Sequence, residues 1–132
     1  MEVSPSQGFL PEDLAHLHVH SEYSLTDGAI NFDQLMETVK SYGQKAVALT
    51  DHGNLFGAIE FYLAAQSAGI KPIIGAEVYL WGQDDSHKLQ SEKKPFHLVL
   101  LAKNLNGYHN LIKIVSSAYH PGYSDANPPI IN

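Results

Sequence analysis

Residues 46–54 read AVALTDHGN, and this stretch decides the fold class. The apolar run at 46–50 is typical of a strand that is buried on both faces of a parallel sheet. Polar residues turn the chain at 51–54, and a helix is expected over 55–68, where Gly69 ends it. A buried strand, a polar turn and a helix in this order form the repeating unit of α/β folds.

Strands and helices alternate on both sides of this unit. On the N-terminal side, apolar residues alternate with His over 14–20, which predicts a strand. Helical spacing then runs from Asn31 or Asp33 to about Tyr42. On the C-terminal side, the sequence PIIGAEVYL predicts a strand over 72–80. The order β-α-β-α-β favours parallel strands with right-handed crossovers.

The alternation ends after the third predicted strand. Residues 81–95 are polar and show no amphipathic helix, yet the apolar run FHLVLLAK follows at once over 96–103. Because no crossover helix separates these strands, we expect an antiparallel hairpin with a long loop. Asn104 is the predicted cap of a further helix, and another element is expected to begin at residues 130–131.

Composition limits the function classes. The 132 residues are 44% hydrophobic, and eight Lys and Arg against fourteen Asp and Glu give a formal net charge of -6. An acidic chain is not typical of proteins that bind nucleic acid through its phosphates. The absence of Cys excludes disulfides and thiolate metal ligands. No apolar run approaches the ~18 residues of a membrane span, and no signal peptide is recognisable, so we expect a soluble cytoplasmic protein.

Histidines and carboxylates gather where the predicted strands end. In parallel α/β folds, ligands bind at the carboxyl ends of the strands. His18 and His20 close the first strand, and their two-residue spacing places both side chains on one face. The antiparallel hairpin would bring His97, at the start of its own strand, to the same end of the sheet. The candidate metal ligands are His18, His20, Asp27, His52, Glu77 and His97.

This donor set indicates a metal cluster. Imidazole and carboxylate ligands together suit Zn, Mn or Fe. Six ligands exceed the about four of one tetrahedral ion, so we expect two or more metals, with Glu77 able to bridge them. Many enzymes that catalyse displacement at phosphorus use two closely spaced metal ions. Backbone N–H groups around Gly53 and Asn54, at the start of a helix, would suit the phosphate itself.

Some of these candidates also have simpler interpretations. Asp27 precedes a Gly and could be only a turn residue. His97 lies in an apolar strand and could be a hydrogen-bonded core histidine. Glu77 is harder to explain without a ligand, because a buried and unpaired carboxylate is costly.

Three neighbouring residues receive supporting or packing roles. His16 is expected to pack or to support the site from behind its ligands. Asp51 is expected to cap a helix or to accept a hydrogen bond that orients an imidazole. Tyr79 is interpreted as core packing, and no catalytic residue is assigned beyond the metal ligands.

Long runs of the sequence resemble the polymerase and histidinol phosphatase (PHP) domain. The likeness covers about residues 14–131 and takes the form found in the alpha subunits of bacterial DNA polymerase III. The runs that carry it are HLHVHS from His16, YSLTDG from Tyr23, ALTDHGNLFGA from Ala48, GIKPIIGAE from Gly69 and HLVLLAKN from His97. Their length makes the resemblance specific to that form of the domain.

The resemblance implies a seven-stranded βα barrel that holds up to three metals, usually zinc, manganese or iron. Six of the family's ligand positions carry over to the six candidates named above, and the last three lie in segments that this chain lacks. We therefore expect an α/β fold that is an incomplete, open TIM-like βα barrel of the PHP type. Its divalent metal cluster is expected to be incomplete as well.

The resemblance also implies a domain organisation and a function. Residues 1–13 would be a loosely packed leader, and residues 14–132 a truncated, N-terminal part of a PHP domain. The parent protein would be a DNA-directed DNA polymerase of DNA replication, a nucleotidyltransferase that meets DNA through the missing parts. Its other partners would be the proofreading subunit and the sliding clamp, with no membrane. The PHP domain would be a metal phosphoesterase with a 3′–5′ exonuclease role, and this chain alone would be inactive.

Two other functions stay open on the sequence alone. The chain could be a free-standing phosphatase of the PHP family that acts on a small phosphate monoester. It could also be a non-catalytic module that docks the proofreading subunit. The coding sequence after Asn132 would test the first alternative, and partner binding that survives metal removal would indicate the second.

Overall fold

A computed structural model describes residues 10, 13–25, 27–80, 95–119 and 130–131 of the chain. Three helices and four strands lie in these parts: α1 (Phe32–Ser41), β1 (Ala46–Leu49), α2 (Ala58–Ala68), β2 (Lys71–Leu80), β3 (Phe96–Leu101), α3 (Leu105–Ser117) and β4 (Ile130–Ile131). The expected leader over 1–13 falls almost entirely outside the described residues. None of the described helices is long and apolar enough to cross a membrane.

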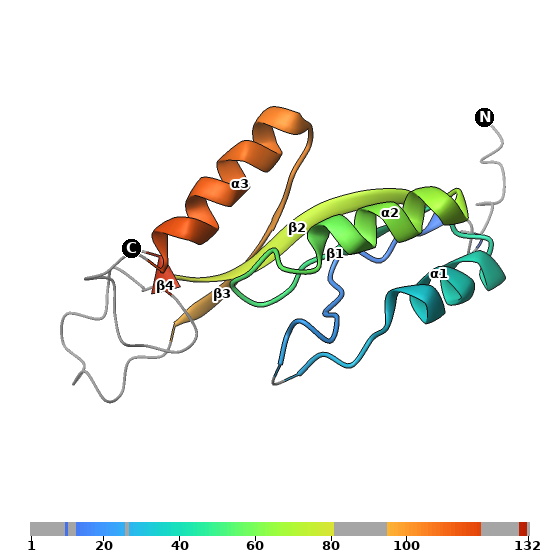
Figure 1. Cartoon of the computed structure of the whole chain (residues 1–132), viewed down its shortest axis with the longest axis horizontal. Helices are drawn as coiled ribbons and strands as arrows, with labels where there is room; N and C mark the ends of the chain where they lie inside the picture. Colours follow the sequence, from blue (N-terminus) through green and yellow to red (C-terminus); the bar gives the residue numbers. More distant parts are fainter. Residues whose placement is uncertain (1–9, 11–12, 26, 81–94, 120–129, 132) are drawn as a thin grey trace, which may run out of the picture.

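The described strands form one open sheet built around β2 (Figure 1). β1 pairs in parallel with the first half of β2, where Ala46 lies opposite Lys71. β3 pairs antiparallel with the second half, where His97 lies opposite Tyr79. The two-residue β4 pairs in parallel with the end of β2. The predicted parallel unit and the predicted antiparallel hairpin are therefore both confirmed.

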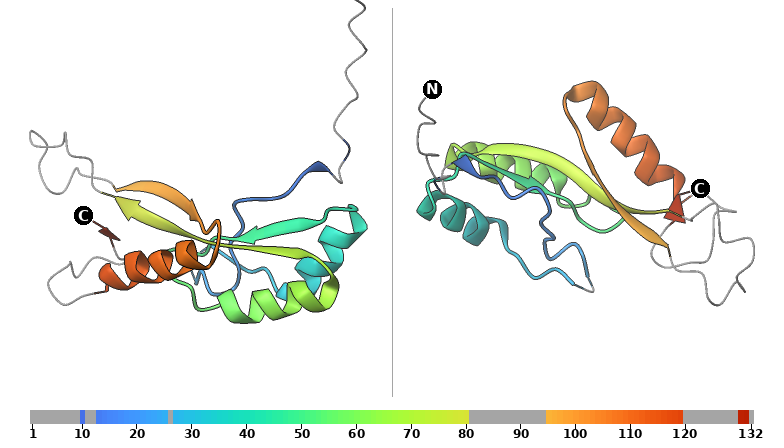
Figure 2. Two further views of the ribbon diagram at one scale, coloured as in Figure 1. Left: turned by 90° about the horizontal axis from the view of Figure 1, so that it is seen from above. Right: turned by 180° about the vertical axis from the view of Figure 1, so that it is seen from behind.

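The helices bury apolar residues against the sheet, in two cores. α2 and α3 lie on the same side of β2 (Figure 2, left). The first core joins α1, α2, β1 and the turn into β2 through Phe32, Met36, Val39, Val47, Leu49, Phe61, Ala65 and Ile70. The second joins β2 and α3 through Ala76, Val78, Leu111 and Val115. Burial of these side chains is what holds the strands in place under the helices.

Helix boundaries follow from local capping. The Asn31 side chain accepts the N–H of Asp33 at 3.0 Å and starts α1, and Asn104 starts α3 in the predicted way. Gly69, at a φ of 73°, ends α2. α2 begins at Ala58, three residues after the predicted start. The reason is that the Asn54 side chain accepts the N–H of Phe56 at 3.0 Å, which holds the chain in a turn before the helix.

The segment over 14–20 runs beside β1 but is not the regular strand that we predicted. The carbonyl of His16 accepts the N–H of Ala48 at 2.8 Å, and the carbonyl of Val19 accepts the N–H of Thr50 at 2.8 Å. The segment advances three residues, from 16 to 19, while the neighbouring chain advances two, from 48 to 50. The one extra residue is the mark of a β-bulge. The bulge breaks the strict alternation that the sequence suggested between His16 and the later histidines.

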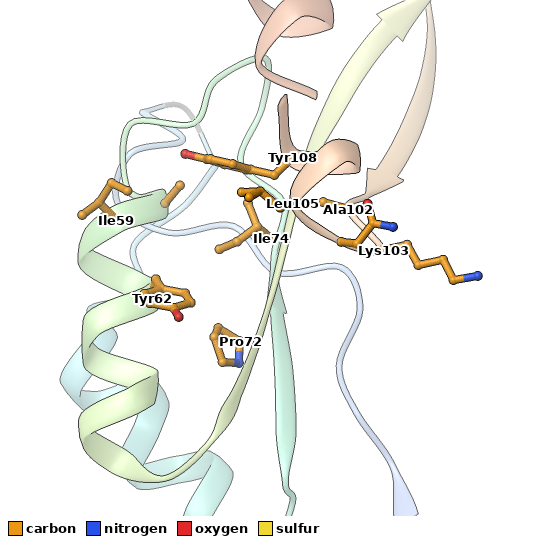
Figure 3. A pocket seen from close by; sticks show the side chains of 10 residues that line it. Ile59, Tyr62, Pro72, Ile74, Ala102, Lys103, Leu105 and Tyr108 are labelled. Carbon is orange, nitrogen blue, oxygen red and sulfur yellow. The ribbon is translucent and has the colours of Figure 1, made fainter. Parts of the chain in front are cut away.

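An apolar cavity of about 470 Å³ lies on the helix side of the sheet (Figure 3). Ile59 and Tyr62 of α2 line it on one side, and Leu105 and Tyr108 of α3 on the other. Ile74 of β2 forms part of its floor. None of the six candidate ligands lines this cavity, so it is separate from the cluster described next.

Candidate metal centre

The candidate ligands meet on the face of β2 that turns away from the helices. Successive side chains of a strand point to opposite faces, so Glu77 and Tyr79 share one face while their neighbours in β2 pack under α3. His52 pairs with Glu77 through an isolated parallel bridge just after β1. His97 lies opposite Tyr79 on β3. Three segments of chain thus bring polar side chains to one face of the sheet.

The carboxylate of Glu77 is the centre of the cluster, and its residue is only 2% exposed. Its Oε2 lies 2.6 Å from Nε2 of His18 and 2.7 Å from Nε2 of His20. The same oxygen lies 3.7 Å from Nε2 of His52. The other oxygen, Oε1, contacts Nδ1 of His97. Four imidazoles therefore surround one buried carboxylate.

Asp27 adds a second carboxylate beside Glu77. Its Oδ2 lies 2.6 Å from Nε2 of His52 and 3.7 Å from Nδ1 of His20. Three overlapping groups result, each with one donor atom per residue and all donor atoms within 4.8 Å: His18, His20 and Glu77; His20, Asp27 and His52; His52, Glu77 and His97. The structure brings all six sequence-predicted ligand candidates together. Because His20, His52 and Glu77 each belong to two groups, the arrangement suits more than one ion.

The charge of Glu77 is stabilised by its neighbours. Burial raises the pKa of this carboxyl, but hydrogen bonds from His18, His20 and His97 outweigh burial. Together with the charge of His52 they lower the pKa to about 2. Glu77 is therefore ionised across the neutral range, which is the state in which a carboxylate binds a cation.

The donor spacing fits a metal ion of the predicted kind. Ligands at ~2.0–2.1 Å around a tetrahedral zinc lie about 3.3 Å from one another. Nε2 of His18 lies 3.1 Å from Nε2 of His20, which is near this spacing, whereas both nitrogens lie at hydrogen-bond distances of 2.6 and 2.7 Å from the Glu77 oxygen. Both nitrogens would have to move away from this oxygen to admit an ion. Imidazole and carboxylate donors are also the chemistry that zinc, manganese and iron prefer.

The cluster is closed on the sheet side and open on the other. Glu77 lies at the buried end, whereas the side chains of His18 and His97 are 55% and 53% exposed. A cavity of about 370 Å³ borders His18, His20 and Asp27. A ligand can therefore reach the exposed imidazoles from solvent without any movement of the sheet.

Asp51 lies behind the cluster and holds the loop that follows His20. It is 1% exposed, and its carboxylate accepts hydrogen bonds from the backbone N–H of Ser21 at 2.7 Å and from the hydroxyl of Ser21 at 2.8 Å. It also accepts from the hydroxyl of Ser24 at 2.7 Å, and the Ser24 oxygen in turn accepts the N–H of His52 at 3.1 Å. Asp51 orders the chain that leads to Asp27, and its expected role as a helix cap or as a residue that orients an imidazole stays a prediction.

One further expectation, the backbone phosphate site, is corrected by the structure, and another, the supporting role of His16, stays a prediction. The N–H of Gly53 donates to the carbonyl of Glu77 at 2.7 Å, and α2 begins only at Ala58, so this N–H is not free for a phosphate. His16 is exposed beside Val47, and within the described part of the chain no hydrogen bond joins its ring to the cluster. Its supporting role therefore stays a prediction.

Sequence reasoning missed one polar contact of the cluster. The hydroxyl of Tyr79 lies 2.5 Å from Nδ1 of His52, although we interpreted this tyrosine as packing. Its position two residues after Glu77 in a strand was a usable signal, since that spacing places both side chains on one face.

Comparison with known proteins agrees with this fold. The PHP domain family matches residues 16–131. The DNA polymerase III subunit alpha of Helicobacter pylori is 51% identical over 108 residues, which are 82% of this chain and 9% of that protein. The same subunit of Aquifex aeolicus is 44% identical over 121 residues, or 86% of this chain and 10% of that protein. The chain thus spans about a tenth of the length of these relatives.

Two solved structures share the fold. An amidohydrolase from Chromobacterium violaceum, solved with bound sulfate and no metal, has a TM-score of 0.51 and 27% identity over 76% of this chain and 32% of its own. A protein from Bifidobacterium adolescentis, named as a metal-dependent phosphoesterase, has a TM-score of 0.53 and 18% identity over 80% of this chain and 34% of its own. The described strands and helices correspond to part of the TIM-like βα barrel of such proteins, as predicted. This chain belongs to the PHP domain family.

Proposed function

We propose that this chain supplies ligands to a multinuclear metal site with phosphoesterase activity. The proposed ligands are His18, His20, Asp27, His52, Glu77 and His97, and the proposed cations are zinc, manganese or iron. We further propose that the chain is the N-terminal part, over residues 14–132, of the PHP domain of a longer DNA polymerase III alpha subunit. Identity of 51% to such subunits over this region supports the proposal.

The proposed task of this site in the longer protein is 3′–5′ exonucleolytic proofreading during DNA replication. The support is that all six carried-over positions hold ligand-type residues and lie together. Polymerisation, contact with DNA, and binding of a proofreading subunit and a sliding clamp are assigned to the longer protein.

One observation above all supports the metal site: four imidazoles surround the buried carboxylate of Glu77. A lone buried glutamate would cost folding free energy, and one histidine would be enough to pair with it. Here Nε2 of His18 and Nε2 of His20 both aim at the same oxygen, at 2.6 and 2.7 Å. Convergence of several imidazole nitrogens on one point is the arrangement of ligands around a shared cation.

The residues of this chain would hold, orient and shield such ions. When bound, divalent cations supply a nucleophile from water near neutral pH and neutralise phosphate oxygens. Glu77 contributes a fixed negative charge from the buried side, and the sheet excludes water behind it. The exposed faces of His18 and His97 leave the opposite side open to a phosphodiester.

The test is metal analysis together with a nuclease assay on the full-length protein. His18→Ala/His20→Ala is compared with wild type and with His109→Ala, which removes an exposed imidazole on α3. We expect the double variant to lose bound metal and 3′–5′ nuclease activity on a single-stranded oligonucleotide. His109→Ala should retain both.

Other outcomes would contradict the proposal in distinct ways. Unchanged metal content and nuclease activity in the double variant would remove the site. Loss of metal with unchanged nuclease activity would leave a structural metal without the proposed catalysis. Hydrolysis of a small phosphate monoester without any oligonucleotide degradation would replace the nuclease with a phosphatase.

A further inference from the structure

Tyr79 joins two of the candidate ligands from a buried position. Its ring stacks on His52 with centroids 5.6 Å apart and planes inclined by 25°. It meets His97 edge to face, with centroids 4.5 Å apart. Its hydroxyl lies 2.5 Å from Nδ1 of His52. A buried tyrosine usually finds some hydrogen-bond partner. Here the partner is Nδ1 of His52, whose other nitrogen, Nε2, faces the cluster.

We propose that Tyr79 is a positioning residue of the metal site, which holds the His52 ring so that Nε2 points at the cluster. This inference rests on the proposed function, because it concerns the same site. Metal-binding histidines almost always use their second nitrogen in a hydrogen bond that sets ring orientation and tautomer. For His52 the hydroxyl of Tyr79 occupies that place.

A hydroxyl suits this place because it can both donate and accept. Nε2 of His52 faces the cluster and lies 2.6 Å from Oδ2 of Asp27. On the other side of the ring, the Tyr79 hydroxyl can donate to Nδ1 when that nitrogen is bare and accept from it when it carries the proton. A cation on Nε2 requires the proton on Nδ1, and the Tyr79 oxygen can then accept it. One residue therefore satisfies the ring in both tautomers, whereas a carboxylate or carbonyl could satisfy only one.

The neighbouring rings hold the Tyr79 hydroxyl in place. The side chain cannot swing away, because His52 stacks on its ring and His97 lies against it. The hydroxyl is thus fixed by packing as well as by its hydrogen bond.

The experiment uses this 132-residue chain and the substitution Tyr79→Phe, which removes the hydroxyl and keeps the ring. Tyr62→Phe is the matched control, since it removes a tyrosine hydroxyl that bonds Gln66 on the exposed side of α2. Zinc affinity is measured by competition with a chelator. The tautomer of His52 is read in the cation-free protein from the ring ¹⁵N shifts.

We expect Tyr79→Phe to weaken zinc binding by about 10–100-fold, the usual loss for an outer hydrogen-bond partner of a ligand. The ¹⁵N shifts of His52 should move, and Tyr62→Phe should change neither quantity. In a His52→Ala background, Tyr79→Phe should cause little further loss, because Tyr79 acts through His52. A merely structural role would weaken binding equally in both backgrounds.

The contrary results are separable. Wild-type zinc affinity and unchanged His52 shifts in Tyr79→Phe would overturn this inference and leave the metal site standing. Absence of bound zinc from the wild-type full-length protein would overturn both the proposed function and this inference. If Tyr79→Phe does not fold, uniform 3-fluorotyrosine labelling of the wild-type chain replaces it, since the more acidic phenol must shift the His52 nitrogens. Unmoved nitrogens in the labelled chain would overturn the inference.

Discussion

Asp51 shows how one residue outside the donor set holds the centre together. Its two oxygens accept three hydrogen bonds from Ser21 and Ser24, and all of them are buried. Because His20 precedes Ser21 directly, this network restrains the backbone next to His20. Ser24 links this network to His52, because its hydroxyl oxygen accepts the backbone N–H of His52. The position of two candidate ligands therefore depends on a carboxylate that contacts neither ring.

We predict that Asp51→Asn lowers the free energy of unfolding by about 1–3 kcal/mol. The amide nitrogen would face a serine donor, and a buried donor without an acceptor costs about this much. Urea unfolding of the 132-residue chain measures the change. Glu37→Gln, at an exposed site on α1, is the control and should change stability by less than about 0.5 kcal/mol. Equal stability of both variants would show that the network is not required.

At this scale the sequence predicts residue types well and their partners poorly. His18, His20 and Glu77 were identifiable because ligand-type residues stood at strand ends or in an apolar strand. Tyr79 was interpreted as packing, and Asp51 was expected only in a supporting role, because each has a common packing or capping role that one sequence cannot exclude. Their hydrogen bonds depend on which distant segment the fold brings within reach.

Among the elements, the hairpin of β2 and β3 matters most for the site. It was predictable because no helical sequence lies between the strands, and it alone brings His97 to Glu77. The bulge beside β1 was not predictable, because it arises from hydrogen bonds between segments about 30 residues apart. The late start of α2 depends on the Asn54 side chain, whose turn resembles a helix start in sequence.

The loop that carries Asp27 closes only because residue 28 is glycine. A Cβ at Gly28 would lie 1.8 Å from the carbonyl oxygen of Ser21. Gly28 also donates its N–H to the carbonyl of Ser24 at 2.8 Å. Any side chain at this position must therefore push the loop away from the cluster.

We predict that Gly28→Ala destabilises the chain by about 1–3 kcal/mol, the usual cost of overpacking, and weakens zinc binding. Gly107→Ala, in the first turn of α3, is the matched control, because its Cβ would meet nothing closer than 3.5 Å. The control should be neutral or stabilising by up to about 1 kcal/mol. Thermal unfolding and chelator competition measure both effects. A Gly28→Ala variant with the stability and the zinc affinity of wild type would show that the loop does not need glycine at this position.

Over the whole molecule, the described surface carries many exposed apolar side chains. Ile59 and Leu63 of α2, Phe96 and Leu98 of β3, and Leu105 of α3 are all exposed. β3 also lies at the edge of the sheet within the described residues, and an open edge strand can pair with another chain. The isolated chain should therefore associate with itself.

We predict that the 132-residue chain forms oligomers as its concentration rises, as measured by sedimentation velocity. Phe96→Lys/Leu98→Lys should shift it toward monomer, because charge on an edge strand opposes pairing. Leu25→Lys, at a highly exposed loop position, should leave the association unchanged. A wild-type chain that stays monomeric at every concentration would contradict the prediction.

The most direct measurement of the central claim is anomalous X-ray diffraction at the zinc edge from crystals of this chain grown with zinc. We expect the strongest anomalous peak within about 2.0–2.2 Å of a Glu77 oxygen and of the nearest imidazole nitrogens of His18 and His20. Zinc that saturates other parts of the chain while no peak lies among these side chains would contradict it.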